Sequence, residues 1–196
     1  MNLRLAQLSD AKSIAEIYAP YIQTTITFET AAPDEAEMRK RLEQITVSYP
    51  WIVLEDQDVI GYAYLSPFNT REAYQHSADL SIYLNQDMKH KGYGRIMCET
   101  LFEIALHQNI HRIVSLVTAE NTASAHFHHH LNFDCQGSLK NVGYKHDKWL
   151  DVSFYVKDLQ GFNKPEAFIP FSSIEKEKVQ KILDKYNQTP SFRTSV

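Results

Sequence analysis

The sequence predicts an α/β protein in which a mixed β-sheet is flanked by helices. Segments of alternating or β-branched residues, typical of strands, recur between segments that place apolar residues at helical spacing. An alternating strand at residues 78–84 leads through a glycine-bearing turn into an amphipathic helix at about 95–108. Together these patterns predict the order β-α-α-β-β-β-α-β-α-β-β, in which strands and helices are mixed along the chain.

The first part of the chain is predicted to hold one strand and two helices. Residues 3–6 alternate as a strand, and Ser9 is a suitable N-cap for a helix that we expect to end near Pro20. The β-branched residues at 24–28 indicate extended backbone. We place Pro33 at the first position of the second helix, because acidic residues follow it.

The later elements are predicted from the same two patterns, alternation for strands and helical spacing for helices. Residues 51–54 and 59–65 flank a polar turn and are predicted to form a hairpin. A polar loop at 69–75 precedes the central strand. Beyond the central helix we expect a strand at 111–118, a short helix after Asn121, and strands at 133–137 and 150–156.

The last part of the chain differs in composition from the rest. We predict a main domain over residues 1–160 and a C-terminal extension over 161–196. The extension is rich in Lys and Glu, and its apolar residues predict an amphipathic helix that begins near Ser172 or Ser173. We expect this helix to pack on the domain surface or on a partner subunit, and residues 189–196 to be loosely held.

Composition narrows the classes of function. The chain has 196 residues, a net charge of −4 and a pI near 6.1, which argues against a general nucleic-acid-binding protein. Two cysteines, Cys98 and Cys135, do not indicate a disulfide framework. The first residues lack the layout of a signal peptide, and no apolar run reaches membrane-spanning length. We therefore expect a cytoplasmic protein with no membrane partner.

The turn before the central helix has the features of a phosphate-binding loop. It reads Lys89, His90, Lys91, Gly92, Tyr93 and Gly94. Backbone N–H groups at the start of a helix have no partner within the helix and lie at the positive end of its dipole, so they suit a phosphate or pyrophosphate. The glycines allow close approach and the basic residues add positive charge, although a plain turn is an equally acceptable reading of this motif alone.

The loop resembles the [Q/R]-x-x-G-x-[G/A] motif of the GCN5-related N-acetyltransferases (GNAT), with Lys89 in place of Gln or Arg. Over about residues 3–159 the chain also resembles one branch, the phosphinothricin acetyltransferases and their relatives that act on methionine sulfoximine and sulfone. The matching stretches are Thr27-Phe28, Tyr49-Pro50-Trp51, Arg71-Glu72-Ala73-Tyr74, residues 79–84, Gly92-Tyr93-Gly94, and Gly143-Tyr144-Lys145-His146 with Trp149 and Asp151. The branch usually has Gly where this chain has Asn132.

The resemblance implies a sheet that splays open between its two middle parallel strands, where acetyl-CoA enters as co-substrate. It implies that the loop at 89–94 holds the pyrophosphate and that the backbone of Ile82 and Leu84 pairs with the pantetheine arm. It further implies that Asn121 and Ser124 hydrogen-bond CoA, and that His128 protonates the leaving thiolate. A homodimer is expected on the same basis.

Asp79 and His146 are the candidate proton acceptors. Asp79 shares one face of its strand with Ser81 and Tyr83, and an acidic residue within a strand is unusual. The resemblance places a carboxylate here beside the amine, as base, as water relay or as amine-binding group. The alternative is a solvent-facing carboxylate or a partner for a hydrogen-bond donor of a loop. Histidine is a side chain suited to proton transfer at neutral pH, and His146 matches an active-site histidine of the branch, although an isolated loop histidine is usually exposed.

Arg71 is the candidate for the acid group of the substrate, because guanidinium binds carboxylate or phosphinate in a bidentate manner. A surface ion pair with Glu72 is the alternative. Phe28, Tyr74 and Trp51 are candidates for the pocket wall and are equally acceptable as core residues. His126, His128, His129 and His130 do not form a metal-ligand set, since consecutive helical residues point in different directions, so we expect no metal.

These observations predict an acetyl-CoA-dependent N-acetyltransferase that acetylates the α-amine of a small amino-acid-like molecule by direct transfer in a ternary complex. Phosphinothricin, methionine sulfoximine and methionine sulfone are the leading acceptors. Two alternatives stay open: an acetyltransferase acting on a protein N-terminus or a polyamine, and a non-catalytic module that senses CoA. Arg71 disfavours a polyamine, which has no anionic group.

Overall fold

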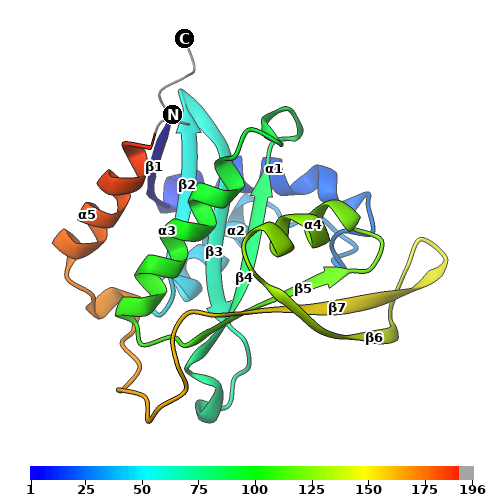
Figure 1. Cartoon of the computed structure of the whole chain (residues 1–196). Helices are drawn as coiled ribbons and strands as arrows, with labels where there is room; N and C mark the ends of the chain where they lie inside the picture. The colour runs from blue at the N-terminus through cyan, green and yellow to red at the C-terminus, as the bar shows by residue number, and fades with distance from the viewer. Residues whose placement is uncertain (190–196) are drawn as a thin grey trace.

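The computed structural model describes residues 1–189 and contains one seven-stranded sheet flanked by helices (Figure 1). The strands are β1 (Asn2–Leu5), β2 (Trp51–Asp56), β3 (Asp58–Pro67), β4 (Ser77–Leu84), β5 (Arg112–Thr118), β6 (Asp134–Lys145) and β7 (Lys148–Asp158). The helices are α1 (Ala11–Ile22), α2 (Glu35–Ile45), α3 (Tyr93–His107), α4 (Thr122–His130) and α5 (Lys176–Asn187). The predicted order of strands and helices through β7 is confirmed.

The sheet consists of two parts joined by one short parallel contact. Its strand order is β1-β2-β3-β4-β5-β7-β6, and every pairing is antiparallel except that of β4 with β5. Only Ser77, Ala78 and Asp79 of β4 pair with β5, after which the two strands diverge (Figure 1). The predicted splayed mixed sheet is thus confirmed.

Each face of the first part of the sheet has its own apolar core. The helices α3 and α5 cover one face, where Leu80, Met97, Leu101 and Ile182 are buried together. The helices α1 and α2 cover the opposite face, where they pack on side chains of β2 and β3 (Figure 1). Since successive residues of a strand point to opposite faces, β4 sends Leu80 into the first core and Asp79 to the α1–α2 side.

Three local predictions about helix ends were wrong. The residue before α1 is Asp10 rather than Ser9, and Pro20 lies inside this helix, which continues to Ile22. Proline in the last turn removes one hydrogen bond there without ending the helix. Pro33 lies outside α2, because the side chain of Asp34 accepts a hydrogen bond from the backbone N–H of Glu37 and so caps the helix.

The last two strands extend further than predicted. Residues up to Lys145 in β6 and from Lys148 in β7 pair with each other, so the two strands form one long hairpin. His146 and Asp147 form its turn, both with positive φ angles of 51° and 57°. The hairpin protrudes from the body of the molecule (Figure 1).

The helix of the C-terminal extension, α5, packs on the domain, which is one of the two predicted arrangements. It begins at Lys176 rather than near Ser172 or Ser173, and it buries Val179, Ile182 and Leu183 against the core of α3. The Asn187 side chain accepts from the Leu3 N–H at 2.6 Å and donates to the Leu3 carbonyl at 2.9 Å. It thereby pairs with the outer edge of β1. The division of the chain at residue 160 stays a prediction, and residues 190–196 lie outside the described part.

Candidate active site

The gap between β4 and β5 begins immediately after Asp79, the last residue of β4 that pairs with β5. Beyond it, the Leu80 carbonyl accepts a 3.4 Å hydrogen bond from the Ser115 hydroxyl of β5. The Leu84 carbonyl accepts one from the Tyr21 hydroxyl at 2.6 Å. Because backbone groups alternate in direction along a strand, Ile82 directs its backbone to the same side as Leu80 and Leu84. This side of β4 can therefore accept an added extended chain.

The glycine-bearing loop opens directly onto α3. Gly92 precedes the helix with a φ of 84°, a left-handed conformation that favours glycine. A Cβ at Gly94 would lie only 3.2 Å from the Phe127 ring of α4, so glycine allows the two helices to approach. The start of α3 places the positive end of the helix dipole beside the nearby Lys91, an arrangement that suits an anion.

Lys89 is partly covered rather than fully exposed. Its ammonium lies 4.8 Å from the centroid of the Tyr21 ring and donates to the Gln86 side chain at 2.5 Å. Burial lowers the pKa of Lys89 from its ordinary value. His90 and Lys91 are exposed in the same loop. The sequence-predicted anion loop is thus assembled in one place, and its binding of a pyrophosphate stays a prediction.

Asp79 is the perturbed acid of this region. Its Oδ1 is shielded from solvent and has no hydrogen-bond partner among residues 1–189. Desolvation by burial raises the pKa of Asp79 to about 7, and the backbone N–H of Leu80 offsets only part of this effect. A carboxyl group with a pKa near neutral, placed where the sheet opens, can accept and release a proton at physiological pH.

A group of aromatic side chains lies on the same face of the sheet as Asp79. Tyr64 and Tyr62 of β3 stand opposite Ser81 and Tyr83 of β4. With Arg41 and residues of the α1–α2 side they line a small cavity of about 20 Å³. The full lining is Tyr18, Glu29, Met38, Arg41, Trp51, Tyr62, Tyr64 and Tyr83.

An ion pair holds the loop between α1 and α2 against this aromatic group. Arg41 binds both oxygens of Glu29, at 2.8 and 3.1 Å, and Glu29 follows Phe28 directly. Most of this cavity was missed by the sequence analysis. The alternating Tyr62 and Tyr64 of β3 were a usable signal, whereas nothing in the sequence connects Arg41 with Glu29.

The loop between α1 and α2 contacts the β6–β7 hairpin. The Phe28 ring, 40% exposed, covers Gly143 of β6 so closely that a Cβ there would lie 2.4 Å from it. The Lys145 ammonium donates to the Thr27 carbonyl at 2.8 Å. His146, the next residue, is exposed in the hairpin turn. The loop that carries Phe28 therefore contacts the hairpin whose turn carries His146, while the role of each residue stays a prediction.

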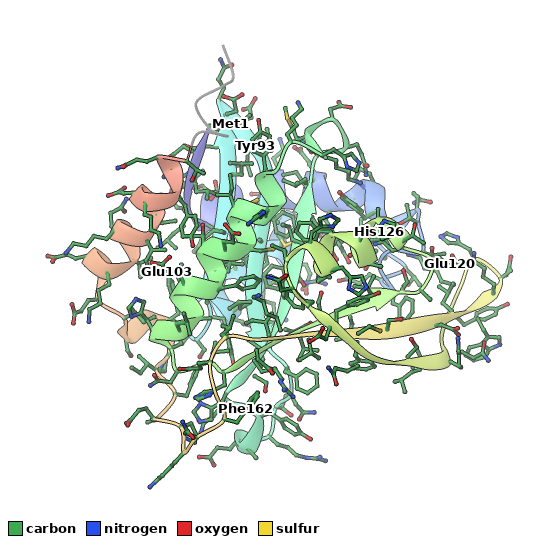
Figure 2. The ribbon with its side chains drawn as sticks, viewed as in Figure 1. Met1, Tyr93, Glu103, Glu120, His126 and Phe162 are labelled. Carbon is green, nitrogen blue, oxygen red and sulfur yellow. The ribbon has the colours of Figure 1, made fainter. Side chains whose placement is uncertain are left out.

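One carboxylate connects three segments: the loop between α1 and α2, the loop after β5, and the β6–β7 hairpin. Glu120 follows β5 and lies beside the hairpin (Figure 2). It accepts from the Thr25 hydroxyl at 3.0 Å and from the Lys148 ammonium at 2.7 Å. Nothing in the sequence indicates this arrangement, because the three residues are separated by more than twenty positions.

Arg71 and Tyr74 lie in the loop between β3 and β4. Arg71 is exposed, and its side chain has no hydrogen bond or ion pair within residues 1–189. The suggested ion pair with Glu72 is therefore absent from this part of the chain. Tyr74 is 39% exposed and packs on Phe68 with a centroid distance of 5.7 Å. Their binding of substrate stays a prediction.

His128 is buried in α4 among aromatic rings, including Phe133 at 5.0 Å and Tyr155 at 5.4 Å between centroids. Its Nδ1 lies 2.7 Å from the Ser124 carbonyl, which can only accept, so Nδ1 carries the proton of the neutral ring. Burial lowers the pKa of His128, despite the hydrogen bond to Ser124. This environment favours a packing role, and proton donation to a thiolate stays a prediction.

Asn121 and Ser124 begin α4, as predicted. The Asn121 side chain accepts from the Ser124 N–H at 3.1 Å and caps the helix. The Ser124 hydroxyl lies 3.3 Å from Nδ1 of His128. Both side chains thus have a structural role, and their contact with CoA stays a prediction.

Two general features concern residues 1–189. Within them, three or more His, Cys, Asp or Glu side chains nowhere gather in a way that could hold a metal ion. Likewise, none of the described helices is long and apolar enough to cross a membrane.

A larger cavity, of about 280 Å³, lies beside Ser77 at the start of β4. His76, His111, Arg112 and Phe162 contribute to its lining, and Phe162 marks its position in Figure 2. It contains none of the predicted site residues. The gap beside β4, rather than this cavity, is the candidate active site.

Residues 3–154 match the family model described as an acetyltransferase (GNAT) domain. The chain belongs to the GNAT acetyltransferase family. This acetyltransferase is 28% identical to a phosphinothricin N-acetyltransferase of Streptomyces viridochromogenes, over 89% of its own length and 96% of that of the relative. It is also 28% identical to an L-methionine sulfoximine/L-methionine sulfone acetyltransferase of Pseudomonas paraeruginosa, over 81% and 94% of the two chains.

A solved structure supports the same grouping. This acetyltransferase superposes on a GNAT superfamily phosphinothricin acetyltransferase from Sinorhizobium meliloti, in complex with acetyl-CoA, with a TM-score of 0.81. The identity is 35%, and the match covers 88% of this chain and 97% of that chain. The predicted family and branch are confirmed by these similarities.

Proposed function

We propose that this acetyltransferase transfers the acetyl group of acetyl-CoA to the α-amine of a small amino-acid-like acceptor, with Asp79 as the proton acceptor. Phosphinothricin, methionine sulfoximine and methionine sulfone are the proposed acceptors. The similarity to acetyltransferases with these named substrates, one of them solved with acetyl-CoA, supports the donor and the acceptor class.

The position and pKa of Asp79 carry the proposal. An α-ammonium group must lose a proton before its nitrogen can attack a thioester carbonyl. With a pKa of about 7, the carboxylate of Asp79 is available at neutral pH and is basic enough to receive that proton, directly or through a water molecule. Its place at the last paired step between β4 and β5, directly before the gap, is where a donor in the gap and an acceptor on the α1–α2 side can meet.

Acetyl-CoA, when bound, supplies the thioester; the chain holds it and removes a proton from the amine. The backbone side of Leu80, Ile82 and Leu84 binds the extended arm, and the loop at 89–94 binds the pyrophosphate. Attack by the amine forms the C–N bond and breaks the C–S bond. The nitrogen loses a second proton, the departing thiolate takes up one, and Asp79 returns its proton to solvent, so the products are an N-acetyl amino acid and CoA.

Direct transfer fits the cysteine environment. Cys98 lies buried inside α3, and burial raises the pKa of its thiol, so this group is a poor nucleophile. Cys135 is exposed on β6, outside the gap. A covalent acetyl-enzyme has no support from either residue.

The test is the release of free CoA from acetyl-CoA with a panel of acceptors: phosphinothricin, methionine sulfoximine, methionine sulfone, spermidine and a short peptide. We expect turnover with one or more of the first three. Turnover with spermidine or the peptide alone would contradict the acceptor class, and CoA binding without any turnover would favour the sensor alternative. The expected homodimer stays a prediction, which light scattering in solution tests.

A further inference from the structure

Lys145 differs from the other lysines that contact the active-site region. Only 6% of its surface is exposed, although it ends a strand beside a hairpin turn. Within residues 1–189 its ammonium has one hydrogen-bond acceptor, the Thr27 carbonyl, and no ion pair with a carboxylate. Lys148, three residues later, is exposed and pairs with Glu120. Among the described residues, Lys145 is therefore a shielded cation without an ion-pair partner.

Such an arrangement is unfavourable unless another group completes it. A lysine ammonium has three N–H donors, and the Thr27 carbonyl accepts from one of them. A buried charge is normally paired, because removing it from water is costly. Burial lowers the pKa of Lys145, while the charge of Glu29 partly opposes this effect from beyond ion-pair distance. An anionic ligand would satisfy the remaining donors.

The position of Lys145 connects it to the acceptor side of the gap. Its partner Thr27 shares a hydrogen bond, through its own hydroxyl, with the hydroxyl of Tyr18. Tyr18 in turn packs edge-on against Tyr83 of β4, with ring centroids 4.8 Å apart. Tyr83 is on the same face of β4 as Asp79. A continuous set of contacts thus links the cation with the side of the sheet that carries the proton acceptor.

We propose that Lys145 binds the anionic group of the acceptor and so selects amines that carry an acid. This proposal rests on the proposed function, since it assigns a residue to recognition of the same acceptor. The ammonium of Lys145 and the carboxylate of Asp79 would bind opposite charges of one zwitterionic molecule. Arg71, exposed in the β3–β4 loop, is the competing candidate for this role, and acceptors with two acid groups can use both cations.

The experiment compares an acid-bearing acceptor with its decarboxylated analogue. Methionine sulfone and 3-(methylsulfonyl)propylamine differ only in the carboxylate. For Lys145→Met we expect kcat/KM with methionine sulfone to fall about 30- to 100-fold, within the range for removing one partner of a shielded charge pair. With the amine analogue we expect a change below about threefold, and KM for acetyl-CoA should not change. Lys145→Arg should retain a preference for the acid.

Controls separate recognition from structure. Lys140→Met changes an exposed lysine of the same strand, paired with Asp151, and should leave both acceptors unaffected. An equal loss with both acceptors in Lys145→Met would mean that Lys145 only positions the Thr27 loop, and would overturn the proposal. The same holds if Arg71→Met, and not Lys145→Met, removes the preference for the acid. Lys145→Gln provides the same comparison if the Met variant does not fold.

The wild-type measurement distinguishes this proposal from the proposed function. If another acid-bearing acceptor is the better substrate, the same comparison is made with that acceptor and its decarboxylated form. Wild-type turnover of acid-free amines alone would contradict both proposals. Turnover of acid-bearing acceptors that is unaffected in Lys145→Met and Lys145→Gln would overturn only the role of Lys145.

Discussion

The two sides of β4 are built in different ways. On the proposed donor side, the surface consists of the backbone of Leu80, Ile82 and Leu84, which lies beyond the β4–β5 ladder, and of the first turn of α3. On the acceptor side, side chains carry the chemistry, and Asp79 and Lys145 come from strands on opposite sides of the gap. The donor side therefore depends on backbone geometry, and the acceptor side depends on the burial and charge of individual side chains.

The two sides should therefore respond differently to substitution. A surface of backbone groups binds the same extended arm whatever the neighbouring side chains are, so it suits a shared donor. A pocket of side chains from separate segments can change residue by residue, so it suits the variable acceptor. The contrast predicts that substitutions on the two sides affect different kinetic constants.

The largest effect is expected for Asp79→Asn. This variant keeps the shape of the side chain but removes the proton acceptor, and general-base catalysis typically contributes 10²- to 10⁴-fold. We expect kcat to fall about 10²- to 10³-fold with little change in KM for acetyl-CoA, measured by CoA release. Loss of acetyl-CoA binding instead would place Asp79 on the donor side and remove the contrast.

Gly92→Val should affect the donor side. Valine is disfavoured at the left-handed φ of 84°, at a cost of roughly 1 to 2 kcal/mol, and rearranging this turn disturbs the N–H groups at the start of α3. We expect KM for acetyl-CoA to rise about tenfold while KM for the acceptor stays the same. Gly161→Val, at a position with open space and no left-handed backbone, is the control. Unchanged acetyl-CoA affinity in Gly92→Val would contradict the anion-loop assignment.

The raised pKa of Asp79 also predicts how the stability of the folded protein depends on pH, and Asp79→Asn tests this. The pKa of Asp79 is about 7 in the folded protein and near its ordinary value of 3.8 when unfolded. The folded state thus binds the proton more tightly, and its stability falls as pH rises between these values. We expect wild type to lose on the order of 1 to 4 kcal/mol more than Asp79→Asn between pH 4 and pH 8. Equal slopes in denaturant titrations would mean that Asp79 is not desolvated.

The smallest effect is expected for His128→Gln. Because the neutral ring donates from Nδ1 to the Ser124 carbonyl and burial lowers its pKa, His128 has little capacity to protonate a thiolate. We expect kcat to change less than about threefold, together with a lower melting temperature. A loss of a hundredfold in kcat without loss of stability would instead support the proton-donor role that the family resemblance implies.

The sequence predicted the donor side better than the acceptor side. Alternation at 78–84 and the glycines before α3 are local patterns, and local patterns determine strand direction and helix starts. The pairing of Arg41 with Glu29, the cover of Phe28 on Gly143 and the shielding of Lys145 depend on segments far apart in sequence. Tertiary packing alone produces such contacts. For the same reason the sequence identified Asp79 but not its raised pKa.

The most direct test of the central claim is the dependence of kcat/KM on pH between 5 and 9 for wild type and Asp79→Asn, with a saturating donor and the best acceptor of the panel. For wild type we predict a limb that rises with pH and has a midpoint near 7, where Asp79 loses its proton. In Asp79→Asn this limb should be absent, leaving only the titration of the acceptor amine at higher pH. A profile that keeps the same midpoint in both proteins would contradict the role of Asp79 as the proton acceptor.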